Sequence, residues 1–292
     1  MSPTGILLVD KPDGMTSHDV VSRARRALGT RKVGHAGTLD PMATGLLLLG
    51  VGSSTRLLTY LVGLGKRYAA TIRLGVATDT DDAKGEVIAT ADASGVTRER
   101  IDAGVTALTG ALQQVPSSFS AIKVDGRRSY DRARAGEEVV LEPRSVTVSR
   151  FEIVDERRSA QTVDLDVVVE CSSGTYIRAL ARDLGRDLQV GGHLTALRRE
   201  AIGPFEVRDA VALDDIGPEA LRAPAAIAGE LFPTAELAPV QAADLANGKR
   251  IALDAADAPV VAAIASGRLI GLAEVTGGRA RVLVNFPVEE TT

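Results

Sequence analysis

The sequence predicts an α+β fold, in which a mixed, mostly antiparallel sheet flanked by helices is followed by a small β-rich module. Candidate strands and helices are interspersed without strict alternation, which argues against a doubly wound parallel sheet because that fold alternates the two. The composition changes after about Asp209, and short β-like runs separated by turn residues follow. We therefore expect two domains, residues 1–229 and 230–292.

The N-terminal part of the sequence predicts strands separated by helices. Apolar runs bounded by turn residues indicate buried strands. Ser17 is a good N-cap, and Gly29 is a good stop, for a helix between them. In order, the predicted elements are a strand at Ile6–Val9, a helix from Ser17 to about Leu28, a loop from Thr30 to Thr44, a strand at Leu46–Val51, a helix from Ser54 to Leu64 and a strand at Tyr68–Leu74.

The remaining elements follow from the same signals. They are a helix at Thr97–Leu108, a hairpin at Ala121–Val124 with Asp125 and Gly126 in its turn, strands at Val146–Val154 and Val163–Cys171, a helix that Thr175 caps and that runs to about Leu188, and a strand at His193–Ile202. Residues 210–240 are rich in Ala and Pro and suggest a linker or an irregular joint. Beyond them, strands at Val260–Ile264, Leu269–Val275 and Ala280–Phe286 suggest a small β-barrel-like module.

One acidic loop, Asp79–Asp82 followed by Gly85, has two interpretations. A solvated turn is the favoured one. A site for a hard cation is the alternative, but the loop lacks the spaced ligands of a calcium-binding loop.

Composition excludes several classes of protein. The formal net charge of −4 gives no support to nucleic-acid binding by itself, although the distribution of charge matters more than its total. The single cysteine, Cys171, excludes an internal disulfide and a multi-thiolate zinc site, and we expect it to pack at the end of a strand. No basic-then-apolar leader and no membrane-length apolar run are present, so we expect a cytoplasmic protein without a membrane segment.

The run from Gly37 to Leu47, GTLDPMATGLL, is the most informative feature of the chain. It places one acid, Asp40, between two glycines that permit tight turns, Gly37 and Gly45, and directly before a proline that disfavours helix. Alone, Asp before Pro indicates only a turn. Binding and catalytic groups concentrate on shaped loops of this kind, so Asp40 is also a candidate nucleophile or base.

Basic residues gather on the N-terminal side of this loop. A solvated helix face explains part of the cluster, but next to the Asp40 loop an edge that contacts phosphates is the better interpretation. The basic residues are Lys11, Arg23, Arg25, Arg26, Arg31 and Lys32.

Four motifs, in the correct order, resemble those of the pseudouridine synthases. The Gly37–Gly45 run resembles their catalytic loop. Gly5–Pro12 with Gly14–Ser17 resembles the opening motif of the branch that modifies uridine 55 in the T loop of transfer RNA, and Lys66–Tyr68 and Gly174–Arg178 resemble its later motifs. The likeness covers roughly residues 5–205, and four motifs together are far more specific than one.

The resemblance implies roles for individual residues. It implies that Asp40 is the catalytic carboxylate, that Arg178 is its ion-pair partner and that Tyr68 stacks on the uracil and takes a proton from C5. It further implies that Tyr176 and Leu197 line the pocket, and that His35 contacts substrate beside Arg31 and Lys32. Lys11 resembles a lysine that either contacts substrate or holds the loop of Gly14. We expect His18 and His193 to be ordinary polar residues.

The function implied is the isomerisation of uridine 55 to pseudouridine by base flipping, cleavage of the N1 glycosidic bond and reattachment at C5. No metal or other cofactor is expected, and the partner would be the T stem-loop of tRNA, bound by a monomer. Asp244–Arg250 resembles the start of the RNA-binding PUA domain. The alternative is a non-catalytic RNA-binding protein or RNA-folding chaperone on the same scaffold.

Overall fold

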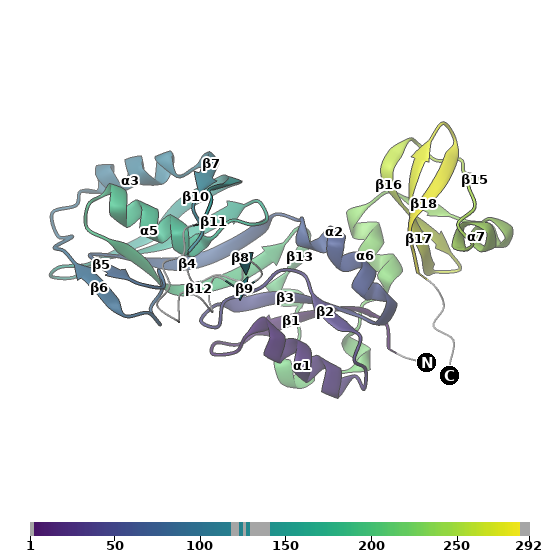
Figure 1. Cartoon of the computed structure of the whole chain (residues 1–292), viewed down its shortest axis with the longest axis horizontal. Helices are drawn as coiled ribbons and strands as arrows, with labels where there is room; N and C mark the ends of the chain where they lie inside the picture. The colour runs from purple at the N-terminus through teal and green to yellow at the C-terminus, as the bar shows by residue number, and fades with distance from the viewer. Residues whose placement is uncertain (1–2, 118–122, 125–126, 129–140, 287–292) are drawn as a thin grey trace. The chain divides into compact units, whose positions relative to one another are not determined.

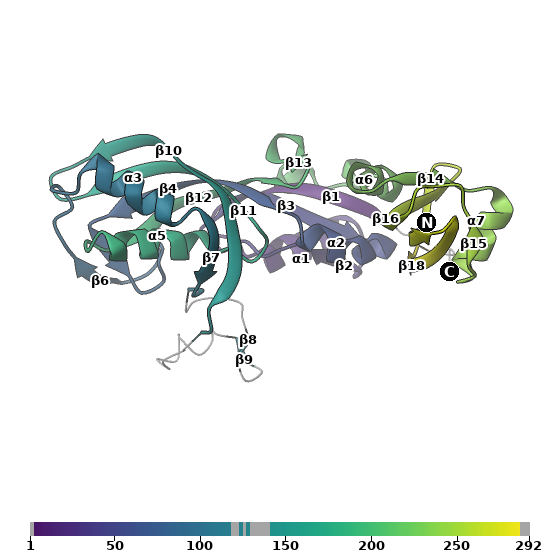
Figure 2. The same ribbon diagram turned by 90° about the horizontal axis from the view of Figure 1, so that it is seen from above.

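A computed structural model describes residues 3–117, 123–124, 127–128 and 141–286. The chain forms two compact units, of which unit 1 contains residues 1–41, 45–62 and 204–292 and unit 2 contains residues 42–44 and 63–203. The elements are labelled in Figure 1 and seen from above in Figure 2. Within the described part of the chain, no helix is both long and apolar enough to cross a membrane.

Unit 1 begins with a short antiparallel sheet covered by a helix. Strand β3 (Thr44–Val51) pairs with β1 (Gly5–Lys11) along its whole length and with β2 (Val33–His35) at its end. Helix α1 (Ser17–Ala27) packs its apolar face on these strands. The buried residues of this core include Leu7, Val9, Val20, Val21, Ala24, Leu47 and Leu49. The predicted strands are confirmed, and the predicted loop contains β2 as well.

The helix predicted at Ser54–Leu64 is instead a 3₁₀ segment (Gly52–Leu57) followed by the short helix α2 (Leu58–Val62). Gly52 has a positive φ of 60°, and the Thr55 hydroxyl donates to the Gly52 carbonyl at 2.9 Å. Side-chain bonds of this kind compete with regular helix hydrogen bonding. The sequence therefore forms a tighter turn than its apolar spacing predicts.

Residues 210–240 do not form the predicted linker, since they contain a helix at Pro224–Leu231 and a strand at Thr234–Glu236, and residues 204–222 run beside β1. Their backbone pairs with β1, since Arg222 exchanges two hydrogen bonds with Ile6 (3.0 and 2.8 Å) and the Val211 amide donates to the Leu8 carbonyl at 3.0 Å. Ile216 is buried in the core under α1. The segment also contains β13 (Phe205–Glu206) and three 3₁₀ turns, at Val207–Asp209, Leu213–Asp215 and Pro218–Ala220. The predicted irregularity is confirmed, but the segment covers a sheet edge that would otherwise leave polar backbone groups unpaired.

The end of unit 1 is the predicted β-rich module. Helix α6 (Pro224–Leu231) precedes a five-stranded sheet in the order β14-β16-β17-β18-β15, and α7 (Pro239–Ala246) packs on it (Figure 1). The strands are β14 (Thr234–Glu236), β15 (Ile251–Ala252), β16 (Ala258–Ala265), β17 (Arg268–Thr276) and β18 (Arg279–Asn285). The module has its own core, built around Leu245, Val261 and Val275.

Unit 2 is an antiparallel sheet in the order β12-β4-β11-β10-β7. Its strands are β4 (Lys66–Leu74), β7 (Gly110–Gln114), β10 (Arg144–Arg158), β11 (Val163–Cys171) and β12 (Gly192–Ile202). Helix α5 (Ile177–Asp187) packs on β12, and α3 (Arg98–Ala107) packs on α5 (Figure 2). Together with the module, this arrangement confirms the α+β prediction.

Two hairpins complete unit 2. One pairs β5 (Val76–Thr78) with β6 (Val87–Thr90), and the other pairs β8 (Lys123–Val124) with β9 (Arg127–Arg128). The second is the predicted hairpin; its turn residues, and the first two residues of the predicted strand at 121–124, lie outside the described residues. Cys171 is buried at the end of β11, as predicted.

Candidate active site

Asp40 lies in the loop between β2 and β3, and both of its chain neighbours are hydrogen-bonded to residues near the start of the chain. The buried Ser17 hydroxyl accepts a hydrogen bond from the Leu39 amide at 2.8 Å and donates one to the Leu39 carbonyl at 3.2 Å. On the other side, the Pro41 carbonyl accepts from the Gly14 amide at 2.9 Å. The half-buried Asp40 therefore sits on a loop whose backbone is fixed at both flanking residues.

Two glycines bend the chain at either end of this loop. Gly37 has φ 94° and Gly45 has φ 100°, values that L side chains rarely adopt. Gly37 lies in a bend of the loop, whereas Gly45 lies within β3, paired with Lys11, so a turn is confirmed only at Gly37. The positive φ explains the glycine at each position.

Lys11, at the end of β1, is fully buried and joins two loops. Its ammonium donates to the carbonyls of Pro12 (2.9 Å), Met15 (2.7 Å) and Pro41 (3.2 Å). A buried ammonium needs such acceptors because burying an unpaired charge is costly. This geometry fits the loop-holding alternative for Lys11, and contact with substrate stays a prediction.

The basic cluster is mostly exposed. Arg26, Arg31 and Lys32 are exposed, and Arg23 forms an ion pair with Asp214. Arg31 and Lys32 directly precede β2. Exposed cations are well suited to contact phosphate, and contact of Arg31 and Lys32 with substrate stays a prediction.

His35 closes β2, half-buried and in register with Leu49 of β3. Its predicted contact with substrate stays a prediction. His193, by contrast, is buried with Nδ1 at 2.9 Å from the Val76 carbonyl, which confirms it as a satisfied polar residue. His18 is exposed.

In unit 2, Tyr68 lies near the start of β4 and is buried. The β4 residues alternate strictly between buried and half-buried, so Tyr68 belongs to the covered face. It is in register with Val169 of β11 and with the buried Arg199 of β12, and Leu197 is in register with Ala70. Opposite residues of antiparallel strands share a face, so Tyr68, Arg199 and Leu197 lie on one face of the sheet.

Arg178 lies in the first turn of α5 and is 3% exposed. Its Nη1 donates to the Thr80 carbonyl at 2.7 Å and to the Ser117 hydroxyl at 3.3 Å, and it is 3.4 Å from an Asp82 carboxylate oxygen. Arg178 is thus held by the loop that precedes β6. Asp40 belongs to unit 1 and Arg178 to unit 2, and their pairing stays a prediction.

The neighbouring Asp81 makes a second pair with α5. Its carboxylate is 3.4 Å from Arg182 Nη1, one helical turn beyond Arg178. Burial is the main cause that raises the pKa of Asp81, while the Arg182 charge opposes it. Asp81 and Asp82 are both buried, so the predicted solvated turn is wrong. In the part of the chain that the structure describes, no cluster of His, Cys, Asp or Glu side chains is placed to hold a metal ion.

Tyr176, not Thr175, is the N-cap residue of α5. The Thr175 hydroxyl donates instead to the Ser172 carbonyl at 3.0 Å. The Tyr176 backbone is held by the buried Gln114 side chain, whose Oε1 accepts from the Tyr176 amide (2.8 Å) and whose Nε2 donates to the Tyr176 carbonyl (3.0 Å). The Gln114 side chain thereby satisfies both backbone groups of Tyr176, as a neighbouring strand would.

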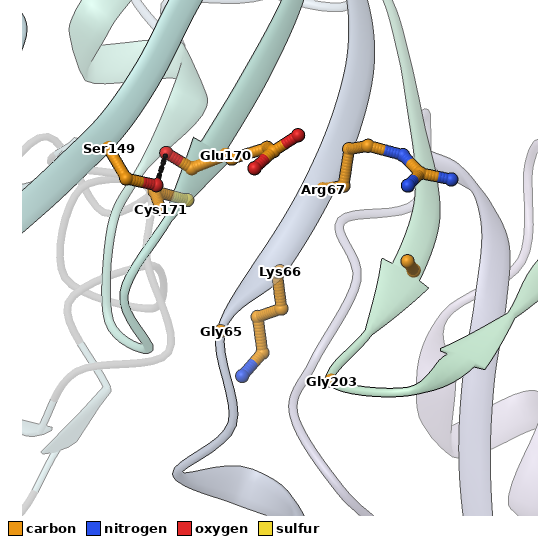
Figure 3. Close-up of a pocket in the computed structure, with 8 residues that line it drawn as sticks. Gly65, Lys66, Arg67, Ser149, Glu170, Cys171 and Gly203 are labelled. Carbon is orange, nitrogen blue, oxygen red and sulfur yellow. Dashed lines mark hydrogen bonds between the residues drawn. The ribbon is translucent and has the colours of Figure 1, made fainter.

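A cavity of about 250 Å³ opens where β4 begins and β11 and β12 end (Figure 3). Lys66 extends along it, and burial, followed by the charge of Arg199, lowers the pKa of Lys66 to about 8. Burial raises the pKa of the Cys171 thiol to about 11. Besides Lys66 and Cys171, the lining residues are Gly65, Arg67, Ser149, Glu170, Ala201 and Gly203.

Sequence reasoning missed three residues that hold the candidate site: Ser17 as a partner of Leu39, Asp82 as a partner of Arg178, and Gln114 as a partner of Tyr176. One signal was available for Asp82. Arg178 and Arg182 are four residues apart, which places both on one helix face, and two cations on a buried face require nearby acids.

Family models match almost the whole chain. Residues 25–177 match the N-terminal domain of the TruB family pseudouridylate synthases, residues 178–233 the C-terminal domain of tRNA pseudouridylate synthase B, and residues 232–287 the C-terminal model of tRNA pseudouridine synthase II. The chain belongs to the TruB family of pseudouridine synthases.

Curated relatives match this TruB-family chain over most of its length. A tRNA pseudouridine synthase B from Leifsonia xyli subsp. xyli is 57% identical over 99% of both chains, and one from Arthrobacter sp. (strain FB24) is 52% identical over 98% of both. One from Rhodococcus jostii is 65% identical over 74% of this chain and 71% of its own. These relatives identify the chain as a pseudouridine synthase.

Solved structures share the fold. A Cbf5-Nop10-Gar1 complex aligns with a TM-score of 0.72 at 24% identity, covering 97% of this chain and 85% of that chain. An H/ACA RNP bound to a substrate RNA containing 2′-deoxyuridine aligns with a TM-score of 0.71 at 22% identity, covering 98% and 86%. At such identity the likeness concerns the fold of the TruB-family chain alone.

Proposed function

We propose that this protein converts uridine 55 in the T loop of tRNA to pseudouridine, with Asp40 as the catalytic carboxylate. It acts on the T stem-loop as a monomer in the cytoplasm. The observation that carries the proposal is the Asp40 loop, in which buried groups hydrogen-bond to Leu39 and to Pro41 on either side of the acid. Relatives named tRNA pseudouridine synthase B support tRNA as the substrate class.

The reaction needs one carboxylate and no external reactant. The bond between N1 and C1′ breaks, the uracil turns, C5 bonds to C1′, C5 loses a proton and N1 gains one. Asp40 either attacks C1′ and is later displaced, or takes a proton from the sugar and returns it. Both routes leave atoms and charge balanced, and both need an ionised carboxylate.

The other residues bind and orient. Tyr68 stacks on the flipped uracil and accepts the C5 proton, while Leu197 and Tyr176 form apolar walls of the pocket. The resemblance gives Arg178 the role of ion-pair partner to the Asp40 carboxylate. His35 supports the RNA where the flipped base has left its stack, and Arg31 and Lys32 contact phosphates.

Asp40→Asn tests the proposal because it removes the ionisable group and keeps the shape. We expect the variant to bind tRNA with an unchanged Kd and to form no pseudouridine, as measured by mass spectrometry of digested tRNA. A tRNA with cytidine at position 55 is the substrate control and should yield no product with the natural protein. Conversion by folded, contamination-free Asp40→Asn protein would remove Asp40 from the chemistry, and conversion of the cytidine-55 tRNA would move the target away from position 55.

A further inference from the structure

Ser17 is the first residue of α1, yet its side chain bonds outside its own helix. Its hydroxyl accepts from the Leu39 amide at 2.8 Å and donates to the Leu39 carbonyl at 3.2 Å. Ser17 is 2% exposed and Leu39 is 3% exposed, so water does not compete for these bonds. A single hydroxyl thus satisfies both backbone groups of the residue before Asp40.

Helix α1 does not need the Ser17 hydroxyl. Thr16 is the N-cap, and its side chain accepts from the Asp19 amide at 3.1 Å. In return, the Asp19 carboxylate accepts from the Thr16 amide at 2.9 Å, which completes a capping box. The Ser17 hydroxyl is therefore available to bond to the Asp40 loop, and this role is separate from the helix cap that Thr16 provides.

The bonds to Leu39 determine how the chain enters Asp40. With the residue before Asp40 fixed at both polar groups and the Pro41 carbonyl held by the Gly14 amide, the backbone on both sides of the Asp40 Cα is tethered. The direction of a side chain follows from its backbone and rotamer. A displacement of about 1 Å at a reacting group costs about a hundredfold in rate.

We propose that Ser17 is a positioning residue for Asp40, acting through the backbone of Leu39 and not through substrate. This inference rests on the proposed function, in which the Asp40 carboxylate reacts. Because Ser17 and Leu39 are both buried, removing the hydroxyl should lower kcat and leave the affinity for tRNA unchanged.

The experiment compares three variants with matched chemistry. Ser17→Ala removes the hydroxyl from the loop, Thr16→Ala removes the cap from the same helix, and Ser17→Thr restores a hydroxyl. We expect Ser17→Ala to lower the single-turnover kcat at least about tenfold with an unchanged Kd for tRNA. Thr16→Ala should lower the Tm by about 2–4 °C and leave kcat unchanged, and Ser17→Thr should recover most of the rate.

A second measurement uses the natural protein alone. The Leu39 amide should be protected from hydrogen exchange, because it donates to a buried side chain, and this test holds even where Ser17→Ala fails to fold. Full kcat in Ser17→Ala, an equal loss of kcat in Thr16→Ala, or an unprotected Leu39 amide would each overturn the inference. Turnover by Asp40→Asn would instead overturn the proposed function, so the two failures are distinguishable.

Discussion

Two neighbouring carboxylates of the 79–82 loop, Asp81 and Asp82, pair with different arginines of α5. Asp82 lies beside Arg178, which is buried to 3% exposure, and Asp81 lies beside the more exposed Arg182. Removing one partner of a buried ion pair leaves an uncompensated charge, which is far more costly than losing a surface pair. Losing the acid should therefore cost more in the Asp82–Arg178 pair than in the Asp81–Arg182 pair.

Asp82→Asn should lower kcat about tenfold or more, because Arg178 loses the charge that fixes its guanidinium. Asp81→Asn is the matched control, because it changes the neighbouring buried carboxyl, whose partner is Arg182 and not Arg178. Burial raises the pKa of the Asp81 carboxyl. We expect the control to retain most of its rate. Single-turnover pseudouridine formation measures both, and equal rates for the two variants would show that Arg178 does not depend on Asp82.

Lys66 should make stability depend on pH. Its pKa is lowered from 10.5 to about 8, so between these values the unfolded chain binds more protons than the folded one and stability rises with pH. The Cys171 thiol, whose pKa is raised from 9.0 to about 11, acts in the opposite direction above its unfolded value. The effect of Lys66 is therefore cleanest just below pH 9.0.

The measurement is urea unfolding of the natural protein and of Lys66→Met. The buried charge of Lys66 opposes folding at neutral pH, so Lys66→Met should be more stable than the natural protein near pH 7. Its advantage should shrink as pH approaches about 9, where the amine is increasingly neutral in the folded protein. An advantage that does not change with pH would mean that Lys66 keeps an ordinary pKa.

At the scale of elements, local pattern predicts strands better than it predicts helix starts. Strand β11 has the predicted bounds, Val163–Cys171, because its buried and half-buried residues alternate without interruption. In both long helices next to the candidate site, the N-cap lies one residue from the predicted cap: it is Thr16 and not Ser17, and Tyr176 and not Thr175. The reason is the same in each: the Ser17 and Thr175 hydroxyls bond elsewhere, to Leu39 and to the Ser172 carbonyl.

Gln114→Glu should disturb the start of α5. The change keeps an acceptor for the Tyr176 amide but replaces the donor to the Tyr176 carbonyl with an oxygen, so two acceptors face each other. We expect a Tm lower by several degrees and a raised KM for tRNA. Gln113→Glu, the exposed neighbour on β7, is the control and should change neither. Identical behaviour of the two variants would exclude Gln114 as the support of Tyr176.

At the scale of the whole molecule, the negative net charge conceals a local basic edge. Arg31 and Lys32 are exposed and directly precede β2. In unit 2, Arg157 forms ion pairs with Asp155 and Asp166. Arg31→Ala with Lys32→Ala should weaken tRNA binding. It should also reduce the log–log salt slope by about 0.7 for each lost phosphate contact if the RNA there is single-stranded. Arg157→Ala is the control. The measurement is the Kd for tRNA at several salt concentrations, for the natural protein and both variants. The same salt slope in all three would show that this edge does not face RNA.

The sequence predicts most of the architecture but less of the site. Periodicity and turn residues locate the strands of both units, and the resemblance of four motifs identifies the family correctly. The errors concern burial by segments far apart in the chain. Asp81 and Asp82 look solvated from their own loop but lie buried beside α5. Residues 210–240 look like a linker or an irregular joint, but Val211 and Arg222 pair with β1. Neither contact, with α5 or with β1, can be predicted from nearby residues in the sequence.

Ser17 and Gln114 share a property with a practical consequence: neither side chain titrates or carries a net charge. The bonds they make to Leu39 and Tyr176 are therefore insensitive to protonation and weakly sensitive to ionic screening. Salt that releases tRNA should raise KM while leaving turnover of bound RNA constant. A pH–rate profile should likewise report the reacting groups and not the loosening of their supports.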